Sequence, residues 1–368
     1  MPKNKKQTEV SELRRDPVSN EWVLIATARS KRPSAYKEKR KHVVQPRKTC
    51  PFCNLEKSGT NKYSLLYPIN LKSSYARQLK KDSDIQVMQG KEWSLIVVPN
   101  LYPALIPGQF LKKQKQGLHE VLPGRGSHEV LITASHEMDI GRMPLDKVEE
   151  VFKAYQERYV DLCKQCHVKY ISLFHNHGKE AGASLSHPHS QILAIPVIPR
   201  DVKSSLQGSR KYFNKNKRCV HCDMMKWEQK KKDRIVYENK DFVVLCPFSS
   251  SVSFEIRIYP KRHSSYFEEI SPGQLKTLAQ CFKVTLNKMY KALGNPPFNF
   301  FLHTAPCDGV EKKSGRVIRK SKNYNHYHWH FEIHPKLSTW AGFELSTGLE
   351  ISTVEPEFAA DTLRKTSG

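Results

Sequence analysis

Two histidines separated by a single proline, His187 and His189, lie in the segment Gly-Ala-Ser-Leu-Ser-His-Pro-His-Ser-Gln at residues 182–191. Because side chains alternate along an extended strand, we expect His187, His189 and Gln191 on one face. Three polar side chains on one face are an unusual way to build a core, but they suit a metal ligand beside a nucleophilic imidazole. A second segment, His-Tyr-His-Trp-His at residues 326–330, repeats the pattern near the C-terminus.

If His187 binds a metal, His189 remains free to attack a phosphorus atom. The product would be a covalent phosphoramidate, which a second substrate then resolves. A backbone carbonyl at the other ring nitrogen of His189 would fix the tautomer that this attack requires. Gln191 and Ser184 would hydrogen-bond the phosphoryl oxygens as negative charge develops on them. The structural alternative is a strand histidine that is satisfied by a neighbouring group.

Three pairs of cysteines have the spacing Cys-x-x-Cys: Cys50/Cys53, Cys163/Cys166 and Cys219/Cys222. No apolar stretch follows the basic first residues, so we predict no secretory signal and a cytoplasmic location in which thiols stay reduced. Metal ligation then explains such pairs better than disulfides do. The middle pair lies at the end of a predicted helix, where packing is the simpler interpretation.

Zinc prefers four nitrogen or sulfur ligands in a tetrahedron. We predict one zinc site in each half of the chain, because two thiolates and two imidazoles follow one another in the same order in both halves. The predicted ligands are Cys50, Cys53, His136 and His187 in the first half, and Cys219, Cys222, His263 and His328 in the second. Soft thiolates favour zinc over iron.

Other metal-binding arrangements remain open. A single all-thiolate site could join the first and third cysteine pairs, although it would leave the histidines unexplained. His128 and His221 are alternative ligands.

Periodicity predicts several strands and two long helices. Strands are expected at residues 21–28, 93–98, 128–133, 170–174, 191–198, 242–245, 254–259, 299–303 and 327–333. Apolar residues recur at intervals of three and four along residues 144–166 and 272–293, which predicts amphipathic helices. Residues 112–126 are expected to form a polar loop.

Both halves share one order of features: Cys-x-x-Cys, strands, a lone histidine after a strand, a long helix, a strand and His-x-His. This order predicts an α+β fold, built by internal duplication of a unit with a mostly antiparallel sheet and flanking helices. We place the halves at residues 1–200, with the catalytic histidine and the first zinc site, and 201–368, with the second zinc site.

Composition limits the classes of partner. The formal net charge of +25 over 368 residues favours anionic partners such as nucleotides, sugar phosphates or nucleic acid. Hydrophobic residues make up 38% of the chain, which is enough for a folded core rather than a disordered protein. No apolar stretch reaches the length of about 18 residues that a membrane span requires, so no membrane association is predicted.

The segment around His189 resembles the active-site segment of galactose-1-phosphate uridylyltransferases, a family of the histidine-triad superfamily. Asn176-His177-Gly178, Gly182-Ala183-Ser184 and Pro-His-Ser-Gln at 188–191 carry this resemblance. Four further segments resemble the family's N-terminal strand and basic loop, its zinc pair, its nucleoside-binding stretch and its hexose-contacting segment. They are Trp-Val-Leu at 22–24 with Arg-Ser-Lys-Arg-Pro at 29–33, Cys-Pro-Phe-Cys at 50–53, Val-Val-Pro-Asn-Leu-Tyr-Pro-Ala at 97–104, and Gly-Phe-Glu at 342–344. Together they span about residues 12–360.

The resemblance implies a ping-pong reaction with a role in galactose metabolism. UDP-glucose would transfer UMP to His189, glucose 1-phosphate would leave, and galactose 1-phosphate would accept the UMP. The implied contacts are Arg29 and Arg32 with the phosphates, Asn100 and Asn176 with the nucleoside, Gln191 and Ser184 with the transferred phosphate, and Glu344 with the hexose. The resemblance also implies a homodimer with each active site near the subunit interface.

Two departures from the family pattern leave alternatives open. Cys219 and Cys222, together with Gly-Phe-Glu-x-x-Thr-Gly at 342–348, are more similar to plant relatives that transfer AMP from ADP-glucose to phosphate. An ADP-glucose phosphorylase is therefore the alternative function. The segment from His326 fits the histidine-triad pattern more literally than the first, and in that register His328 would be the nucleophile.

Two other function classes compete. A zinc-ribbon protein that binds nucleic acid would explain the charge and the cysteine pairs, but it would need aromatic residues interleaved with basic ones. A dinucleotide hydrolase would differ mainly in using water as the acceptor.

Overall fold

The computed structural model describes residues 11–31, 44–60, 62–68, 93–108, 112–308, 310–313, 316–319 and 323–367. Arg32, a predicted phosphate contact, lies outside these residues.

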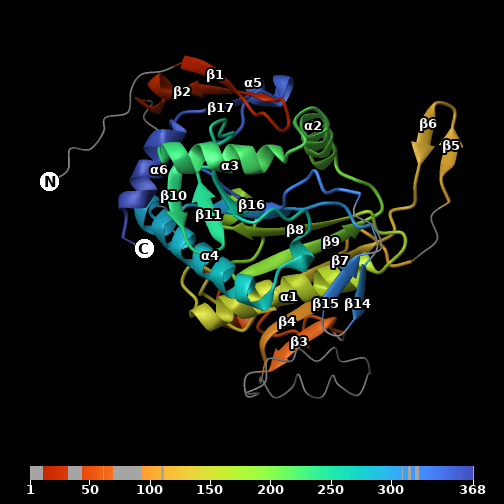
Figure 1. The fold of residues 1–368 in the computed structure, drawn as a ribbon. Helices are drawn as coiled ribbons and strands as arrows, with labels where there is room; N and C mark the ends of the chain where they lie inside the picture. Colours follow the sequence, from red (N-terminus) through yellow and green to blue (C-terminus); the bar gives the residue numbers. More distant parts are fainter. Residues whose placement is uncertain are drawn as a thin grey trace.

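One large sheet forms the centre of the described structure (Figure 1). Its strands are β3 Leu65–Pro68, β4 Trp93–Pro99, β7 Ser127–Thr133, β8 Tyr170–His177, β9 His189–Ile195, β10 Ile235–Glu238, β11 Phe242–Leu245, β12 Ile256–Pro260, β13 Phe298–His303 and β16 His330–Pro335. They lie in the order β10-β11-β12-β16-β13-β8-β9-β7-β4-β3, and every neighbouring pair is antiparallel. The predicted α+β class with an antiparallel sheet is confirmed.

The two halves of this sheet have the same strand order. From the centre outwards, one half runs β8, β9, β7, β4 and β3, and the other runs β13, β16, β12, β11 and β10. The halves meet where β8 pairs with β13, and His177 there lies opposite Phe298. One continuous sheet therefore positions both His-x-His segments, one in each half.

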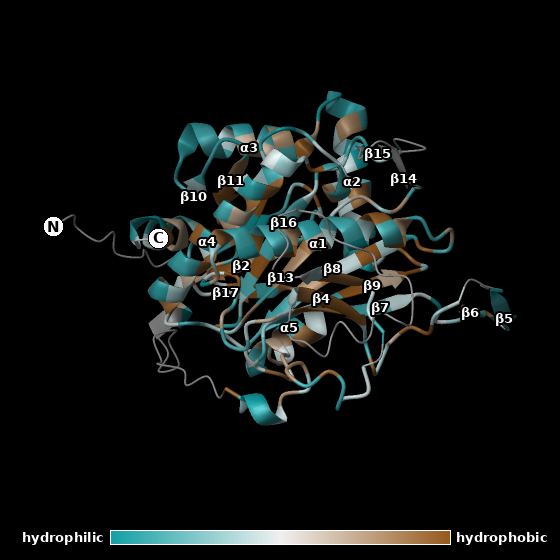
Figure 2. Cartoon of the chain, turned by 90° about the horizontal axis from the view of Figure 1, so that it is seen from below, coloured by the Kyte–Doolittle hydropathy of each residue, from teal (hydrophilic) through white to brown (hydrophobic). Residues whose placement is uncertain are grey.

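The two predicted long helices are confirmed as α1 Leu145–Cys163 and α4 Pro272–Leu293. They pack against each other and share one core with the sheet, where the rings of Phe152 and Phe282 lie 4.6 Å apart. Ser271 and Gln274 form a capping box that starts α4. Figure 2 shows hydrophobic residues concentrated in the strands of the sheet, whereas the helices carry both hydrophilic and hydrophobic residues.

Further helices and a small sheet complete the described structure. The helices are α2 Arg200–Asn216, α3 Val220–Lys231, α5 Gly342–Thr347 and α6 Pro356–Lys365. The small sheet contains β1 Ser11–Arg15, β2 Trp22–Ala26 and β17 Glu350–Ser352, so it joins the two ends of the chain (Figure 1). Short 3-10 turns lie at Thr27–Lys31, Arg47–Thr49, Lys179–Ala181 and Phe267–Glu269.

The polar loop predicted at residues 112–126 is wrong. Two short strands, β5 Gln114–Gln116 and β6 His119–Val121, form a hairpin that projects from the body of the molecule (Figure 1). Gly117 adopts a φ of 63° at its turn, a conformation that glycine reaches without strain. A second hairpin joins β14 Val310–Lys313 to β15 Arg316–Arg319.

Cys163 packs in the core as predicted, but the expectation that the cysteines form no disulfide is wrong. Cys163, the last residue of α1, forms a disulfide with Cys307, and their Cα atoms lie 5.5 Å apart. Cys166 is a free, exposed cysteine. Local spacing could not reveal this pair, because its partners come from different halves of the chain.

Among the described residues, no helix is both long and apolar enough to cross a membrane.

Candidate active site and metal centres

Two thiols and two imidazoles converge at the predicted first metal site. Cys53 Sγ lies 3.2 Å from Nδ1 of His136 and 3.5 Å from Nδ1 of His187. Cys50 Sγ lies 3.6 Å from the same atom of His187, and the two Nδ1 atoms are 3.3 Å apart. The cysteines come from the turns after Arg47–Thr49, and the histidines come from the segments that follow β7 and precede β9. The cluster therefore ties three separate segments together.

The geometry of this cluster fits a tetrahedral zinc ion. Zinc bound to nitrogen and sulfur at its usual bond lengths separates its ligand atoms by roughly 3.3–3.8 Å, close to the distances found here. The Nε2 atoms of His136 and His187 each donate to a backbone carbonyl at 2.7 Å, those of Gln45 and Thr133. The Nδ1 lone pairs consequently face the cluster, as the outer hydrogen bonds of a metal site require. Burial lowers the pKa of His187 to about 4, so its imidazole is neutral at pH 7.

The second predicted cluster repeats this arrangement. Cys222 Sγ lies 3.5 Å from Nδ1 of both His263 and His328, and Cys219 Sγ lies 3.9 Å from Nδ1 of His328. The Nε2 atoms of the two histidines are each 2.9 Å from a backbone carbonyl. Cys219 caps α3 and Cys222 lies in its first turn, which spaces the two thiols for one ion.

The alternative metal arrangements do not form in the described residues. The two cysteine pairs lie in separate clusters rather than in one all-thiolate site. His128 contacts Gln191 instead, and His221 is buried with its ring 5.2 Å from that of His330.

His189 is the first residue of β9 and is buried. Its Nδ1 lies 2.9 Å from the carbonyl oxygen of His187, so Nδ1 carries the proton and Nε2 holds the lone pair. Among the described residues, none forms a hydrogen bond with that Nε2. The ring of Phe52 packs edge-on against the imidazole at 5.0 Å. Burial lowers the pKa of His189, because the charged imidazolium is disfavoured away from water.

Gln191 lies two residues further along β9 and thus on the same face as His189. It is directly opposite Val130 on β7 and Phe174 on β8. Asn176 follows Phe174 on that face, and its Oδ1 accepts a hydrogen bond from Asn299 at 2.8 Å. The strand period therefore places His189, Gln191 and Asn176 on one side of the sheet.

Asn100 joins this group from the end of β4. Its Nδ2 lies 3.1 Å from Nε2 of His128, and Nε2 of His128 lies 2.8 Å from Oε1 of Gln191. This position of His128 beside Gln191 was not predicted from the sequence. The sequence pattern could have indicated this position, because His128 is a polar residue on the same face of β7 as Val130 and Ile132.

Among the described residues, Ser184, Arg29 and Glu344 make no contact that would place them beside His189. Ser184 is exposed in the bend between Gly182 and His187, and Arg29 is exposed in the turn after β2. Glu344 lies in α5, where its Oε2 accepts from the backbone N–H of Ala341 at 3.0 Å. Each of these three roles stays a prediction.

A buried polar chain behind His189 was not predicted. Ser190 points to the opposite face of β9, where its hydroxyl lies 2.5 Å from the Tyr155 hydroxyl and 3.0 Å from Nδ1 of His175. The ring of His175 stacks on Phe300 at 4.9 Å. These bonds fix the strand on its core side, directly between His189 and Gln191.

The second His-x-His segment has the same backbone geometry but a different environment. His328 belongs to the metal cluster, and Nδ1 of His330 lies 3.1 Å from the His328 carbonyl. His330, rather than His328, thus matches His189 in position. Its Nε2 is already bonded to Glu332 at 3.1 Å. The predicted strand from residue 327 begins only at His330, because the preceding residues turn toward the metal cluster.

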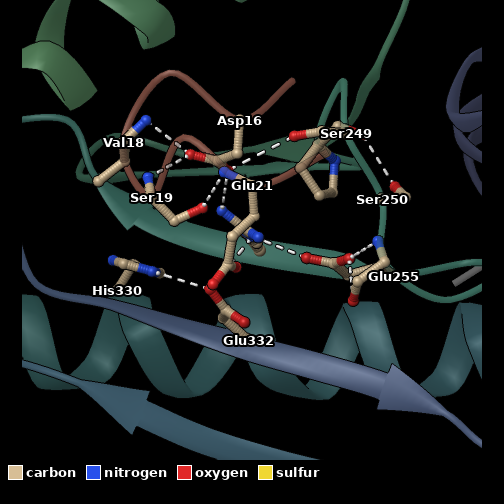
Figure 3. A network of polar contacts seen from close by, with 12 residues as sticks. Asp16, Val18, Ser19, Glu21, Ser249, Ser250, Glu255, His330 and Glu332 are labelled. Carbon is tan, nitrogen blue, oxygen red and sulfur yellow. Dashed lines mark hydrogen bonds and ion pairs between the residues drawn. The ribbon is translucent and has the colours of Figure 1, made fainter. Parts of the chain in front are cut away.

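Charged groups fill the space beside His330 (Figure 3). Arg257 lies 2.7 Å from Glu255, 3.2 Å from Glu332 and 3.4 Å from Asp16. Burial opposes ionisation of Glu332, but Arg257 outweighs it and holds the pKa of this carboxyl well below its usual range. This half of the sheet is therefore covered by the N-terminal segment and holds an internal ion network.

Replacing Arg257 with leucine is expected to destabilise the protein by about 3–5 kcal/mol, because three buried carboxylates lose their shared cation. Denaturant unfolding of the full chain measures this change. Lys113→Leu is the matched control, since its ion pair with Glu120 is more than half exposed, at 57% and 52%, and should contribute less than about 1 kcal/mol. Equal effects of the two substitutions would contradict the expectation.

The chain is similar in sequence to known proteins over most of its length. The model of the galactose-1-phosphate uridyl transferase N-terminal domain matches residues 2–199. An ADP-glucose phosphorylase of Arabidopsis thaliana is 34% identical over 97% of this chain and 93% of its own length. A galactose-1-phosphate uridylyltransferase of Thermotoga maritima is 32% identical over 96% of this chain and 98% of its own.

Solved structures share the fold of this chain. The crystal structure of the Arabidopsis ADP-glucose phosphorylase with bound ADP-glucose has a TM-score of 0.75 and 30% identity, and the match covers 98% of this chain and 100% of that one. A uridylyltransferase structure has a TM-score of 0.68 at 27% identity, with coverage of 97% and 98%. The chain therefore belongs to the galactose-1-phosphate uridyl transferase family of nucleotidyltransferase enzymes.

Proposed function

We propose that this enzyme transfers UMP from UDP-glucose to galactose 1-phosphate through a covalent intermediate on His189. The observation that carries the proposal is the buried His189, whose Nδ1–H is held by the His187 carbonyl while Nε2 is left to react. Nε2 attacks the α-phosphorus, the bond from that phosphorus to the bridging oxygen breaks, and glucose 1-phosphate leaves with the bond's electrons. A phosphate oxygen of galactose 1-phosphate then attacks the same phosphorus, and the electrons of the N–P bond return to Nε2.

The surrounding residues would bind and orient the substrates. Gln191 and Ser184 would hold the transferred phosphoryl group, and Asn100 and Asn176 would contact the nucleoside. Arg29 and Arg32 would attract the phosphates, and Glu344 would accept hydrogen bonds from the hexose hydroxyls. The carbonyl of His187 stabilises the imidazolium that forms when His189 is nucleotidylated, because it accepts a hydrogen bond from Nδ1–H.

Zinc at both clusters is part of the proposal. Cys50, Cys53, His136 and His187 would hold one ion, and Cys219, Cys222, His263 and His328 the other. Each ion would act structurally, as a cross-link with all four positions filled by protein. The first would fix the backbone of His187 and thereby the ring of His189.

Adenylyl transfer from ADP-glucose to phosphate is the second candidate. Two thiols rather than carboxylate and imidazole groups in the second cluster favour it, as does the likeness to a relative named ADP-glucose phosphorylase. Both candidates use His189 in the same way and differ in the base and the acceptor.

We further propose that the matching strand orders reflect an internal duplication, with halves at residues 1–200 and 201–368. A homodimer is part of the proposal, because Glu344 makes no described contact with the residues around His189 and a second copy could supply it. The cytoplasmic location stays a prediction from the sequence.

The test mixes purified protein with UDP-glucose or ADP-glucose labelled at the α-phosphorus and isolates the denatured protein. We expect an acid-labile UMP adduct, which galactose 1-phosphate chases into UDP-galactose. An AMP adduct chased by inorganic phosphate would instead establish the second candidate. If neither adduct forms and the protein binds RNA in a salt-dependent way, the proposed nucleotide transfer is refuted and the nucleic-acid-binding alternative is supported.

A further inference from the structure

His128 has different partners at its two ring nitrogens. Nδ1 accepts a hydrogen bond from the backbone N–H of Ala104 at 3.1 Å. Nε2 lies 2.8 Å from Oε1 of Gln191. A neutral imidazole carries one proton, and since Nδ1 is an acceptor, that proton must be on Nε2. Nε2–H therefore donates to the side-chain oxygen of Gln191.

This hydrogen bond decides which end of the Gln191 amide remains for a ligand. An amide has an acceptor end and a donor end, and His128 engages the acceptor end. We propose that His128 is a positioning residue that turns the N–H₂ group of Gln191, rather than its oxygen, toward the phosphoryl group on His189. This inference rests on the proposed function, because it assigns a consequence to Gln191 in that reaction.

Asn100 is ordered by the same histidine. Its backbone N–H donates to the His128 carbonyl at 2.8 Å, and its side-chain Oδ1 accepts from the N–H of Tyr102 at 2.9 Å. Its Nδ2 lies 3.1 Å from Nε2 of His128 but cannot donate to a nitrogen that carries a proton. That Nδ2 is thus left to donate to a nucleoside. One tautomer of His128 consequently presents two amide donors to an anionic, acceptor-rich substrate.

Without His128, the Gln191 amide would rotate freely. In half of its orientations it would place an oxygen beside a phosphoryl oxygen, where the two acceptors repel each other. The loss should appear in the rate of nucleotide transfer rather than in substrate affinity, because the negative charge on the phosphoryl oxygens grows during transfer.

A double-mutant cycle in the full chain tests this inference. Adduct formation on His189 is measured in single turnover at saturating labelled nucleotide sugar. We expect Gln191→Ala to slow transfer by about 10²–10³-fold and His128→Leu by about 10–100-fold. Because His128 acts through Gln191, the double variant should be no slower than Gln191→Ala, within about twofold.

Conservative and control variants accompany the cycle. A glutamine at 128 can accept from Ala104 and donate to Gln191, so His128→Gln should restore most of the rate that His128→Leu loses. His119→Leu removes an exposed histidine of the β5–β6 hairpin and should leave the rate unchanged. Zinc content and thermal unfolding of each variant show whether it is folded.

The tautomer is measured independently of activity by ¹⁵N NMR of histidine-labelled protein, with the His128 signals assigned by their loss in His128→Gln. We expect a protonated Nε2 and an unprotonated Nδ1. Additive effects in the cycle, or a proton on Nδ1, would overturn the role of His128 alone. A wild-type protein that forms no adduct would instead overturn the proposed function, and this inference with it.

Discussion

Replacing His189 with glycine is expected to lower nucleotide transfer by about 10⁴-fold or more, because no other group replaces the attacking nitrogen. The same variant should keep its zinc, because Nδ1 of His189 bonds only to a backbone carbonyl and is not part of the metal cluster. Adduct formation with labelled UDP-glucose and ADP-glucose measures the first effect, and metal analysis measures the second. Retained transfer would refute the assignment of the nucleophile.

His330→Gln is the matched control for this variant. His330 makes the same contact with the backbone two residues before it, but Glu332 already engages its Nε2. A glutamine can keep a hydrogen bond to Glu332, so this variant should still form the adduct. Loss of the adduct here, with retention in His189→Gly, would move the nucleophile to the second half of the chain.

Removing one thiol of the first cluster should change both the metal content and the rate of transfer. Cys53→Ala is expected to lower zinc content from about two ions per chain to about one and to slow transfer by at least about 10–100-fold. The physical reason is that Cys53 contacts both histidines of the cluster, and the His187 carbonyl orients His189. Metal analysis and single-turnover transfer on the same preparation measure both effects.

Two further cysteine variants separate the metal effect from thiol loss in general. Cys222→Ala should lose the other ion while transfer falls less, because its cluster holds His330 rather than His189 in place. Cys166→Ala removes a free, exposed thiol outside both clusters and should change neither zinc content nor rate. Unchanged zinc in Cys53→Ala would contradict the predicted ligand set.

The parts of the site that follow a short period were predictable from the sequence. The two-residue period of a strand predicted that His189 and Gln191 lie on one face of β9. The shared order of cysteines and histidines in the two halves predicted which residues form each cluster. The helical period predicted the bounds of α4, and it placed the end of α1 three residues too late. Each of these features depends on neighbours within one element or on a pattern repeated in both halves.

Features that depend on distant partners were not predictable. The disulfide of Cys163 has its partner 144 residues away, and spacing along α1 carries no trace of it. The hydrogen bonds of His128 depend on the pairing of β7 with β9. Helix α2 was missed because its buried side is narrow, with only Val202, Leu206 and Ser209 buried.

The pairing of β2 with β17 has a consequence for how the chain folds. Val23 lies beside Glu350, so β2, which can pair with β1 as soon as both are made, gains its second neighbour only after residues 27–349 have been made. Parallel pairing at such a separation closes a very large loop and is intrinsically slow. The pairing of β2 with β17 should therefore be among the last contacts to form as the chain folds.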